Sequence, residues 1–249
     1  MSSIWHTFFF DPVYNSLVFF IDVVRDGDVG LAIICTVILV KLILLPISLK
    51  AARTQLAMRE LEPKLAKIKE DFKDQREMQA TKTMELFREA KVNPFASIFI
   101  LFLQIPIVIA LYLSVSSGGG VKLPDINTVL LYSFIPTPET VNMIFLGFMD
   151  ITARSLPLAL LAGVTQYILT HLTLPPQKPK DPKAEPNFKD DFARSMHIQM
   201  KYVMPVIIII AAYTISAAIA LYFTISNIVS IGQEYVVRHK GLKLPHTTK

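Results

Sequence analysis

The stretch GLAIICTVILVKLILLPISL, residues 30–49, decides the fold of this chain. It is apolar over about 20 residues, the length that a helix needs to cross a hydrocarbon core about 30 Å thick. A single charged side chain, Lys41, interrupts it. A lysine at the centre of a spanning helix costs roughly 2.5–3.5 kcal/mol on insertion scales, so a structural or functional reason is expected for it. Either its long stem lifts the ammonium toward the headgroups near Lys50, or the charge works inside the membrane.

The composition agrees with a membrane protein. The chain has 249 residues, of which 52% are hydrophobic and 18% charged, and this balance is unusual for a soluble domain and typical of a polytopic membrane protein. The net charge of +5 comes from basic residues between the apolar runs, where membrane topology explains them and no nucleic-acid substrate is needed. The one cysteine, Cys35, cannot form an internal disulfide.

The apolar runs predict an all-α polytopic membrane protein with a five-helix transmembrane core. The block from Tyr202 to Ile231 is too long for one untilted span, and basic residues flank it on both sides. We therefore expect two short spans there, with a turn near Tyr213–Ala217. The five predicted spans cover residues 29–49, 93–115, 155–174, 200–214 and 216–235.

The segments between the spans have distinct characters. Residues 1–28 show apolar residues at helical spacing and predict an external helix lying at the membrane interface, although an ordinary packed surface helix fits the pattern as well. The apolar positions are Tyr14, Leu17, Val18, Ile21 and Val24, and the polar positions placed on the other side are Asn15, Asp22 and Arg25.

Residues 50–92 are rich in charge and predict a cytoplasmic helical hairpin with its turn near Asp71–Gln75. Residues 116–154 are expected to form an external loop with short helices, and residues 175–199 a cytoplasmic loop. The tail, residues 236–249, is basic. Basic residues gather in the hairpin, the second loop and the tail, so these three are predicted to be cytoplasmic and the N-terminus external.

No catalytic or metal-binding motif is present. The sequence lacks HExxH, a phosphate loop, GxSxG and any Cys/His cluster with ligand spacing, so we predict no catalytic residue, no metal, no cofactor and no enzymatic function. The spans instead hold polar groups at membrane depth. Each group alone could form a hydrogen bond within its own helix or to a neighbouring helix. Together, the groups suggest a hydrated interior surface. These groups are Lys41, Gln104, Gln166, Thr214, Ser216, Thr224, Ser226, Asn227 and Gln233.

A series of motifs resembles the YidC family of membrane protein insertases, in the short form without a large external domain. The matching stretches are VKLILLP before a charged hairpin, KVNP at 91–94, LFLQIPIVIALY at 101–112, FLGFMDI at 145–151, MPVI at 204–207 and LYFTISNIVSIGQ at 221–233. The resemblance implies a monomeric bacterial cell-membrane protein whose five-helix core encloses a hydrophilic groove, open to the cytoplasm and the lipid but closed to the outside. It also implies that the groove carries a positive charge on the first core span.

Lys41 occupies that position, where bacterial members usually have arginine, so the charge is kept while the guanidinium fork is lost. By the same resemblance, further groove or substrate-contact positions are Val37, Val40, Gln104, Tyr222, Phe223 and Asn227, and the polar groups Gln166, Thr224 and Gln233 are expected to line the same interior. The expected function is to move nascent hydrophobic segments from the cytoplasm into the bilayer. The expected partners are nascent membrane proteins, membrane lipids, the ribosome and a translocon. A small transporter or ion channel could use the same polar lining, and this alternative stays open at the level of sequence.

Overall fold

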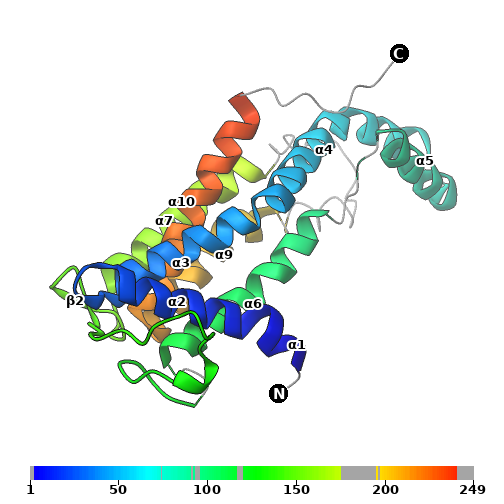
Figure 1. Cartoon of the computed structure of the whole chain (residues 1–249). Helices are drawn as coiled ribbons and strands as arrows, with labels where there is room; N and C mark the ends of the chain where they lie inside the picture. The colour runs from blue at the N-terminus through cyan, green and yellow to red at the C-terminus, as the bar shows by residue number, and fades with distance from the viewer. Residues whose placement is uncertain are drawn as a thin grey trace. The chain divides into compact units, whose positions relative to one another are not determined.

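A computed structural model of the chain describes residues 3–73, 75–90, 92, 96–116, 120–174, 195 and 197–239. The described residues are mostly helical (Figure 1). They divide into two compact units. Unit 1 comprises Met1–Ile43 and Gln104–Gly232, and unit 2 comprises Leu44–Leu103 and Gln233–Lys249.

Unit 1 begins with a nearly continuous helical segment made of α1 (Ser3–Trp5), the π-helical turn η1 (His6–Phe10) and α2 (Asp11–Val23). The apolar positions Tyr14, Leu17, Val18 and Ile21 of α2 are all buried, and α2 packs against α3 (Val29–Ile43). Asn15, predicted to lie on the polar side of this helix, is buried as well. That prediction was wrong because the surface covering Asn15 is itself polar backbone.

A tight turn, η2 (Arg25–Gly27), reverses the chain between α2 and α3. Asp26 and Gly27 both adopt positive φ angles, of 57° and 63°. A side chain at Gly27 would collide with the backbone carbonyl of Thr140, so only glycine fits. Asp28 then caps α3, because its Oδ1 accepts a hydrogen bond of 3.1 Å from the backbone N–H of Leu31.

Residues 30–49 do not form one uninterrupted helix. α3 ends at Ile43, and α4 (Leu45–Asp71) begins after Leu44 with Pro46 in its first turn. Proline has no N–H to donate and its ring clashes with the carbonyl one turn earlier, which interrupts a helix at this point. The first span, predicted for residues 29–49, is therefore broken within its length.

Among the described helices, only α7 (Leu156–Thr173) is long and apolar enough by itself to cross a membrane. α3 and the first part of α4 would supply a second crossing if the broken pair counts as one span. Shorter apolar helical stretches cover Phe102–Ser116, within α6 (Ala96–Ser116), and Gln199–Ile215. The five-span core thus stays a prediction.

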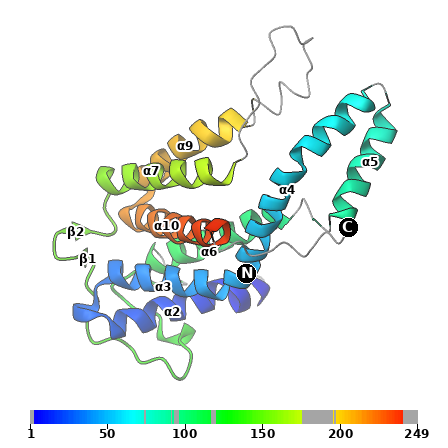
Figure 2. The same ribbon diagram turned by 90° about the horizontal axis from the view of Figure 1, so that it is seen from above.

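Small residues bring α7 close to α9 (Met204–Ile215), which follows the π-helical turn η4 (Gln199–Val203). Figure 2 shows these two helices side by side. Gly163 of α7 lies directly against Ile209 of α9, with no room for a Cβ atom. The buried residues that α7 and α9 contribute to this contact are Ala159, Ala162, Ile208 and Ala212. Close packing through small side chains is how helices associate where lipid removes the hydrophobic driving force.

The chain turns between α9 and α10 (Ala217–His239) at Ser216, which is extended and lies inside the predicted turn. The first two backbone N–H groups of α10 are satisfied by a loop distant in sequence. Ala217 donates to the carbonyl of Ala153 at 2.7 Å, and Ala218 donates to that of Ile151 at 2.9 Å. The start of α10 is therefore held by residues 151–153 rather than by a side-chain cap.

The segment 120–155 contains no α-helix, and of the short helices predicted for residues 116–154 it shows one 3₁₀ turn. It forms a 3₁₀ turn, η3 (Thr128–Leu130), and an antiparallel hairpin of β1 (Ile144–Phe145) and β2 (Met149–Asp150). Its backbone groups bond to α2 and to the turn before α3: Asn142 exchanges hydrogen bonds with Gly27 and Val29, at 2.9 and 3.0 Å. These contacts satisfy the backbone without helical bonds.

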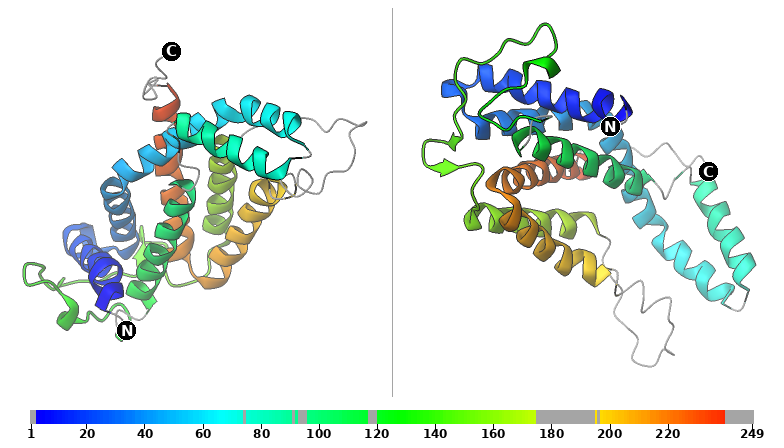
Figure 3. Two further views of the ribbon diagram at one scale, coloured as in Figure 1. Left: turned by 90° about the vertical axis from the view of Figure 1, so that its right-hand side faces the viewer. Right: turned by 90° about the horizontal axis from the view of Figure 1, so that it is seen from below.

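Unit 2 contains α4 and α5 (Arg76–Glu89), which contact each other and are joined by a short turn after Asp71 (Figure 3). No described residue of α5 is buried. The end of α10 also belongs to this unit, where Arg238 Nε lies 2.8 Å from Glu234 Oε1. The KVNP motif apart from Val92, most of the loop at 175–199 and the tail from residue 240 lie outside the described residues.

Candidate functional site

Lys41 lies in the last turn of α3, partly buried, and its ammonium contacts two other helices of unit 1. Nζ donates to Ser230 Oγ of α10 at 3.1 Å and to Gln104 Oε1 of α6 at 3.5 Å. Both acceptors are uncharged. Within the part of the chain that the structure describes, Lys41 forms no salt bridge.

Gln104 connects this lysine to the buried face of α10. While its carbonyl oxygen accepts from Lys41, its Nε2 donates to the hydroxyl of Tyr222 and to Ser226 Oγ, the latter at 3.2 Å. Only a primary amide offers an acceptor and two donors at one side-chain end. Gln104 is therefore the centre of a polar cluster, defined here as Lys41, Gln104, Tyr222, Ser226 and Ser230.

The spacing along α10 explains why three of its residues meet in the polar cluster. Tyr222, Ser226 and Ser230 recur every four residues and so share one helical face. Ser230 Oγ donates to the backbone carbonyl of Ser226 at 2.8 Å, which leaves its lone pairs to accept from Lys41. Tyr222 and Ser226 are 2% and 4% exposed, so the cluster reaches from a buried hydroxyl to a partly accessible ammonium.

The charge of the Lys41 ammonium favours the binding of an anionic group at the polar cluster. An ammonium has three N–H donors, and two of them meet neutral oxygens here. A bond to a neutral oxygen is weaker than one to a carboxylate, so an acidic group reaching Nζ would gain a charge-assisted hydrogen bond. The described neighbours of Lys41 hold the ammonium in place without neutralising it.

Of the other predicted site residues, some lie next to Lys41 on α3, and others contact α7 instead of the polar cluster. Val37 lies buried one turn before Lys41 on α3, and Val40 is partly buried beside it. Asn227 turns to α7, where its Nδ2 donates to Thr165 Oγ1 at 3.3 Å and to the carbonyl of Ala162 at 3.4 Å. Phe223, one turn earlier on the same face, packs on the α7–α9 contact. α10 thus presents one face to the polar cluster and the adjacent face to α7.

Three further candidates are not joined to the polar cluster. Thr224 Oγ1 donates to the carbonyl of Ala220 in its own helix at 2.8 Å. Gln166 Nε2 donates to Thr170 Oγ1 at 3.2 Å, again within one helix. Gln233 belongs to unit 2 and is partly buried. Of the two remaining polar groups, Thr214 donates to its own helix at Ile210 and Ser216 lies buried at the helix break.

Ser230 is the cluster residue absent from the sequence-based candidates. A serine within a helix usually bonds its own backbone, so it carries little information alone. The usable signal was the four-residue spacing from Tyr222 through Ser226, which places Ser230 on the face of the other two.

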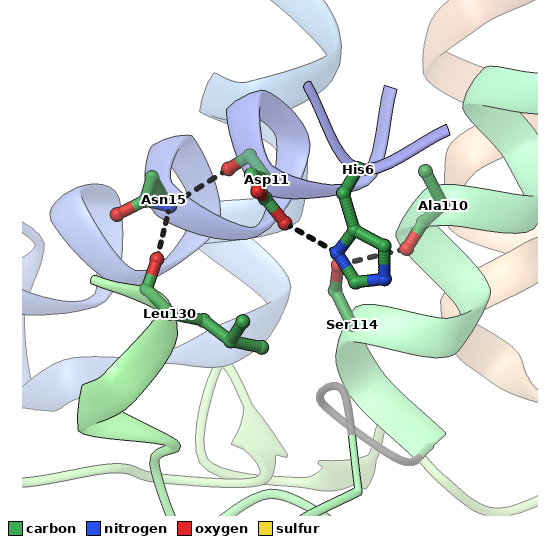
Figure 4. Close-up of polar contacts among 6 residues, drawn as sticks. All are labelled: His6, Asp11, Asn15, Ala110, Ser114 and Leu130. Atoms are coloured by element: carbon green, nitrogen blue, oxygen red, sulfur yellow. Dashed lines mark hydrogen bonds and ion pairs between the residues drawn. The ribbon is translucent and has the colours of Figure 1, made fainter. Parts of the chain in front are cut away.

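A second polar network fixes α2 to the loop that follows α6 (Figure 4). Asn15 is 1% exposed; its Nδ2 donates to the carbonyls of Asp11 and Leu130, at 2.8 and 2.9 Å, and its Oδ1 accepts from the N–H of Tyr132 at 2.7 Å. Beside it on α2, the Tyr14 hydroxyl accepts from the N–H of Asn127 at 2.8 Å. Burial raises the pKa of this hydroxyl, and the bond from Asn127 opposes the shift. Asn15 can be buried because the loop backbone at Leu130 and Tyr132, together with the carbonyl of Asp11 in its own helix, pairs its amide group.

Figure 4 also shows a serine, a histidine and an aspartate, but the bonds given for them do not make a nucleophile and base pair. His6 Nδ1 lies 2.8 Å from Asp11 Oδ1, whereas Ser114 Oγ donates to the carbonyl of Ala110 in its own helix at 2.7 Å. A catalytic serine must give its proton to the base. Among the described residues, no group of three or more His, Cys, Asp or Glu side chains could hold a metal ion.

Comparison with known proteins identifies the family. A family model described as 60Kd inner membrane protein matches residues 19–243. The chain belongs to this family. Among relatives of the 60Kd inner membrane protein family, the membrane protein insertase YidC of Alkalihalophilus pseudofirmus is 30% identical over 253 residues, which cover 96% of this chain and 85% of the relative. The YidC of Fusobacterium nucleatum subsp. nucleatum is 28% identical over 218 residues, covering 86% and 88%.

Some 60Kd inner membrane proteins are much longer. The YidC of Shewanella halifaxensis is 31% identical over 237 residues, which cover 93% of this chain but 38% of the relative. The matches confirm the resemblance to YidC proteins and a place in a family of inner membrane proteins. Because the relatives are insertases and not enzymes, the expectation of a non-enzymatic protein is also confirmed.

Proposed function

We propose that this chain is a membrane protein insertase that transfers nascent hydrophobic segments from the cytoplasm into the bilayer along a hydrated, positively charged path at the polar cluster. The observation that carries the proposal is the Lys41 ammonium, which is held by the neutral groups of Ser230 and Gln104 in a chain of the 60Kd inner membrane protein family. The names of the relatives support the same function.

The physical difficulty for an insertase is the polar flank of its client. A hydrophobic segment enters lipid favourably, but its short hydrophilic flank must leave water, and an unpaired polar group transferred to an apolar medium costs roughly 2–7 kcal/mol. Hydroxyl and amide groups along α10 and α6 can replace part of that hydration. The flank then crosses part of the bilayer without full desolvation, and no nucleotide is needed.

Lys41 adds selectivity for acidic flanks in this proposal. An acidic side chain would bind the ammonium by a charge-assisted bond while the hydrophobic segment moves sideways into lipid. The bond has to be transient, and a lysine suits this because it contacts a carboxylate as a point charge and not through a bidentate fork. The lipid-facing helices then accept the apolar segment.

The proposed topology places the N-terminus outside and the α4–α5 hairpin inside. It rests on the excess of Lys and Arg in the hairpin region compared with the segment 120–155, where the basic residues are Lys122 and Arg154.

Nascent membrane proteins and lipids are the proposed partners, with the ribosome and a translocon beside them. The protein is proposed to act as a monomer without a cofactor.

Site-specific photocrosslinking tests the proposal. A photoreactive residue at Tyr222 or Val40 should form adducts with a ribosome-stalled nascent membrane protein, whereas one at Ile228, exposed elsewhere on α10, serves as the matched control. Strong adducts at Tyr222 and Val40 and weak ones at Ile228 are expected. No adducts at either of the first two positions would contradict the insertase function, and ion or solute flux in proteoliposomes would favour a transporter or channel.

A further inference from the structure

The hairpin of β1 and β2 carries a strained leucine at its tip. Ile144 pairs with Asp150 and Phe145 with Met149, so Leu146, Gly147 and Phe148 form the three-residue turn between the strands. Leu146 and Gly147 both adopt positive φ angles, of 52° and 81°. Glycine adopts this conformation freely, and asparagine tolerates it, but a leucine Cβ is crowded against the backbone. The turn therefore keeps a large apolar side chain at a position that favours Asn or Gly.

Buried contacts with the start of α3 force Leu146 into this conformation. Its backbone N–H donates to Asp28 Oδ2 at 2.8 Å, and Oδ1 of the same carboxylate caps α3 at Leu31. Phe145 is buried with its ring directly against Gly30, where no Cβ would fit. One face of the hairpin is thus fixed to α3 by a buried carboxylate and a buried ring.

The opposite side of the hairpin carries only exposed apolar side chains at its tip. Phe148 is 73% exposed, Leu146 56% and Ile144 39%. The neighbouring polar groups lie toward its base: the Asp150 carboxylate accepts from Thr152 Oγ1 and N at 2.7 and 2.8 Å, which lowers the pKa of Asp150. Three large apolar side chains this exposed beside one another indicate that the tip contacts something outside the chain.

We propose that the Ile144–Phe148 tip is a membrane anchor that inserts its apolar side chains into the outer leaflet, at the boundary between headgroups and acyl chains. The anchor goes beyond the insertase function and rests on the proposed external location of residues 116–154. The hairpin lies at the end of unit 1 where α3 and α7 begin, as Figures 1 and 2 show. α7 starts six residues after Asp150 and continues the exposed apolar surface through Leu156, Leu160, Leu161 and Val164.

Lipid fits this surface better than a protein partner. The exposed surface of α7 belongs to the described helix that is long and apolar enough to cross a membrane by itself, in an inner membrane protein. A hairpin tip next to the outer end of that helix lies at headgroup depth, where aromatic and aliphatic side chains on a polar base insert favourably. The rigid attachment to Asp28 and Gly30 keeps the tip at a fixed depth relative to α3.

A depth measurement tests the anchor. In a Cys35→Ser background, Phe148→Cys is labelled with the environment-sensitive dye NBD, and Glu139→Cys, an exposed polar site in the same loop, is the matched control. Both proteins are reconstituted in phosphatidylethanolamine and phosphatidylglycerol vesicles containing lipids brominated on the acyl chains. We expect several-fold stronger quenching by bromolipid at position 148 than at 139, and stronger quenching by aqueous iodide at 139.

Two outcomes overturn the anchor. Equal iodide quenching at both positions places the tip in water, and protection of position 148 from both quenchers places it in a protein contact such as a second copy.

Leu146→Asn gives an independent check in detergent. A melting temperature equal to or above that of the wild type is expected because the backbone strain at this position is relieved. A marked fall in the melting temperature means that Leu146 packs inside the protein. Insertion of a reporter by the wild-type chain is scored separately, so failure of the anchor and failure of the insertase function are distinguishable.

Discussion

At the scale of single residues, Gln104 holds the polar cluster together because its amide oxygen and its amide nitrogen bond to different residues. Its oxygen accepts from Lys41, and its nitrogen donates to Tyr222 and Ser226. A leucine of similar size could fill the same space but would leave these three groups without their shared partner. Leaving buried polar groups unpaired costs more than the bonds themselves contribute.

Gln104→Leu should therefore lower the free energy of unfolding in detergent by about 1–2 kcal/mol. The matched control is Gln166→Leu, because the Gln166 amide bonds only Thr170 in its own helix. Thermal or denaturant unfolding followed by circular dichroism compares the two. Equal losses in both variants would show that Gln104 has no special structural role.

Sequence alone identified Lys41, Gln104 and Tyr222, because charge, a mid-span amide and the family motif each mark one of them. It did not identify Ser230, whose hydroxyl matters only because α3 lies opposite. It also misplaced Asn15, since the loop backbone that pairs with this amide is more than 100 residues away in sequence. Partners distant in the chain cannot be read from local periodicity.

At the scale of elements, the contact between α7 and α9 depends on Gly163. A Cβ atom at this position has no space, because Ile209 and the carbonyl of Pro205 lie over it. At Gly232 of α10, in contrast, an added Cβ atom would meet nothing within 4 Å. Replacing each of these two helical glycines by alanine should therefore change the free energy of unfolding in opposite directions.

Gly163→Ala should destabilise the protein by about 1–3 kcal/mol, the range for inserting a methyl group into a tight contact. Gly232→Ala should leave stability unchanged or raise it by about 0.5–1 kcal/mol, because alanine favours a helix interior. Unfolding in detergent measures both. A neutral Gly163→Ala would mean that α9 can move away without loss.

The element boundaries show where sequence reasoning succeeds and where it stops. The length of the apolar block and the basic residues on both sides of it predicted a turn near Tyr213–Ala217, and the helix break lies at Ser216. The break at Leu44 was not predicted, although Pro46 marks it. The hairpin of β1 and β2 was not foreseen. Its two-residue strands exist because Asp28 and Gly30 receive them, and those contacts join segments over 100 residues apart.

At the scale of the whole molecule, the proposed topology makes a direct prediction. In a Cys35→Ser background, Thr137→Cys in the segment 120–155 should react with a membrane-impermeant maleimide added to intact cells. Lys73→Cys, in the turn after α4, should react only after the membrane is opened. The reverse pattern would invert the topology and remove the basis for an insertase that receives clients from the cytoplasm.

The central claim is that the Lys41 charge captures acidic flanks of client proteins. The most direct measurement is insertion of two reporters that differ only in an acidic or a neutral flank, by the wild type and by Lys41→Arg, Lys41→Met and Lys41→Glu, with Lys50→Met as the exposed control. We predict that Lys41→Arg and Lys50→Met insert both reporters. Lys41→Met should insert the acidic reporter about tenfold less well, equivalent to about 1.4 kcal/mol, and Lys41→Glu should fail with it. Normal insertion of both reporters by Lys41→Met would contradict the claim.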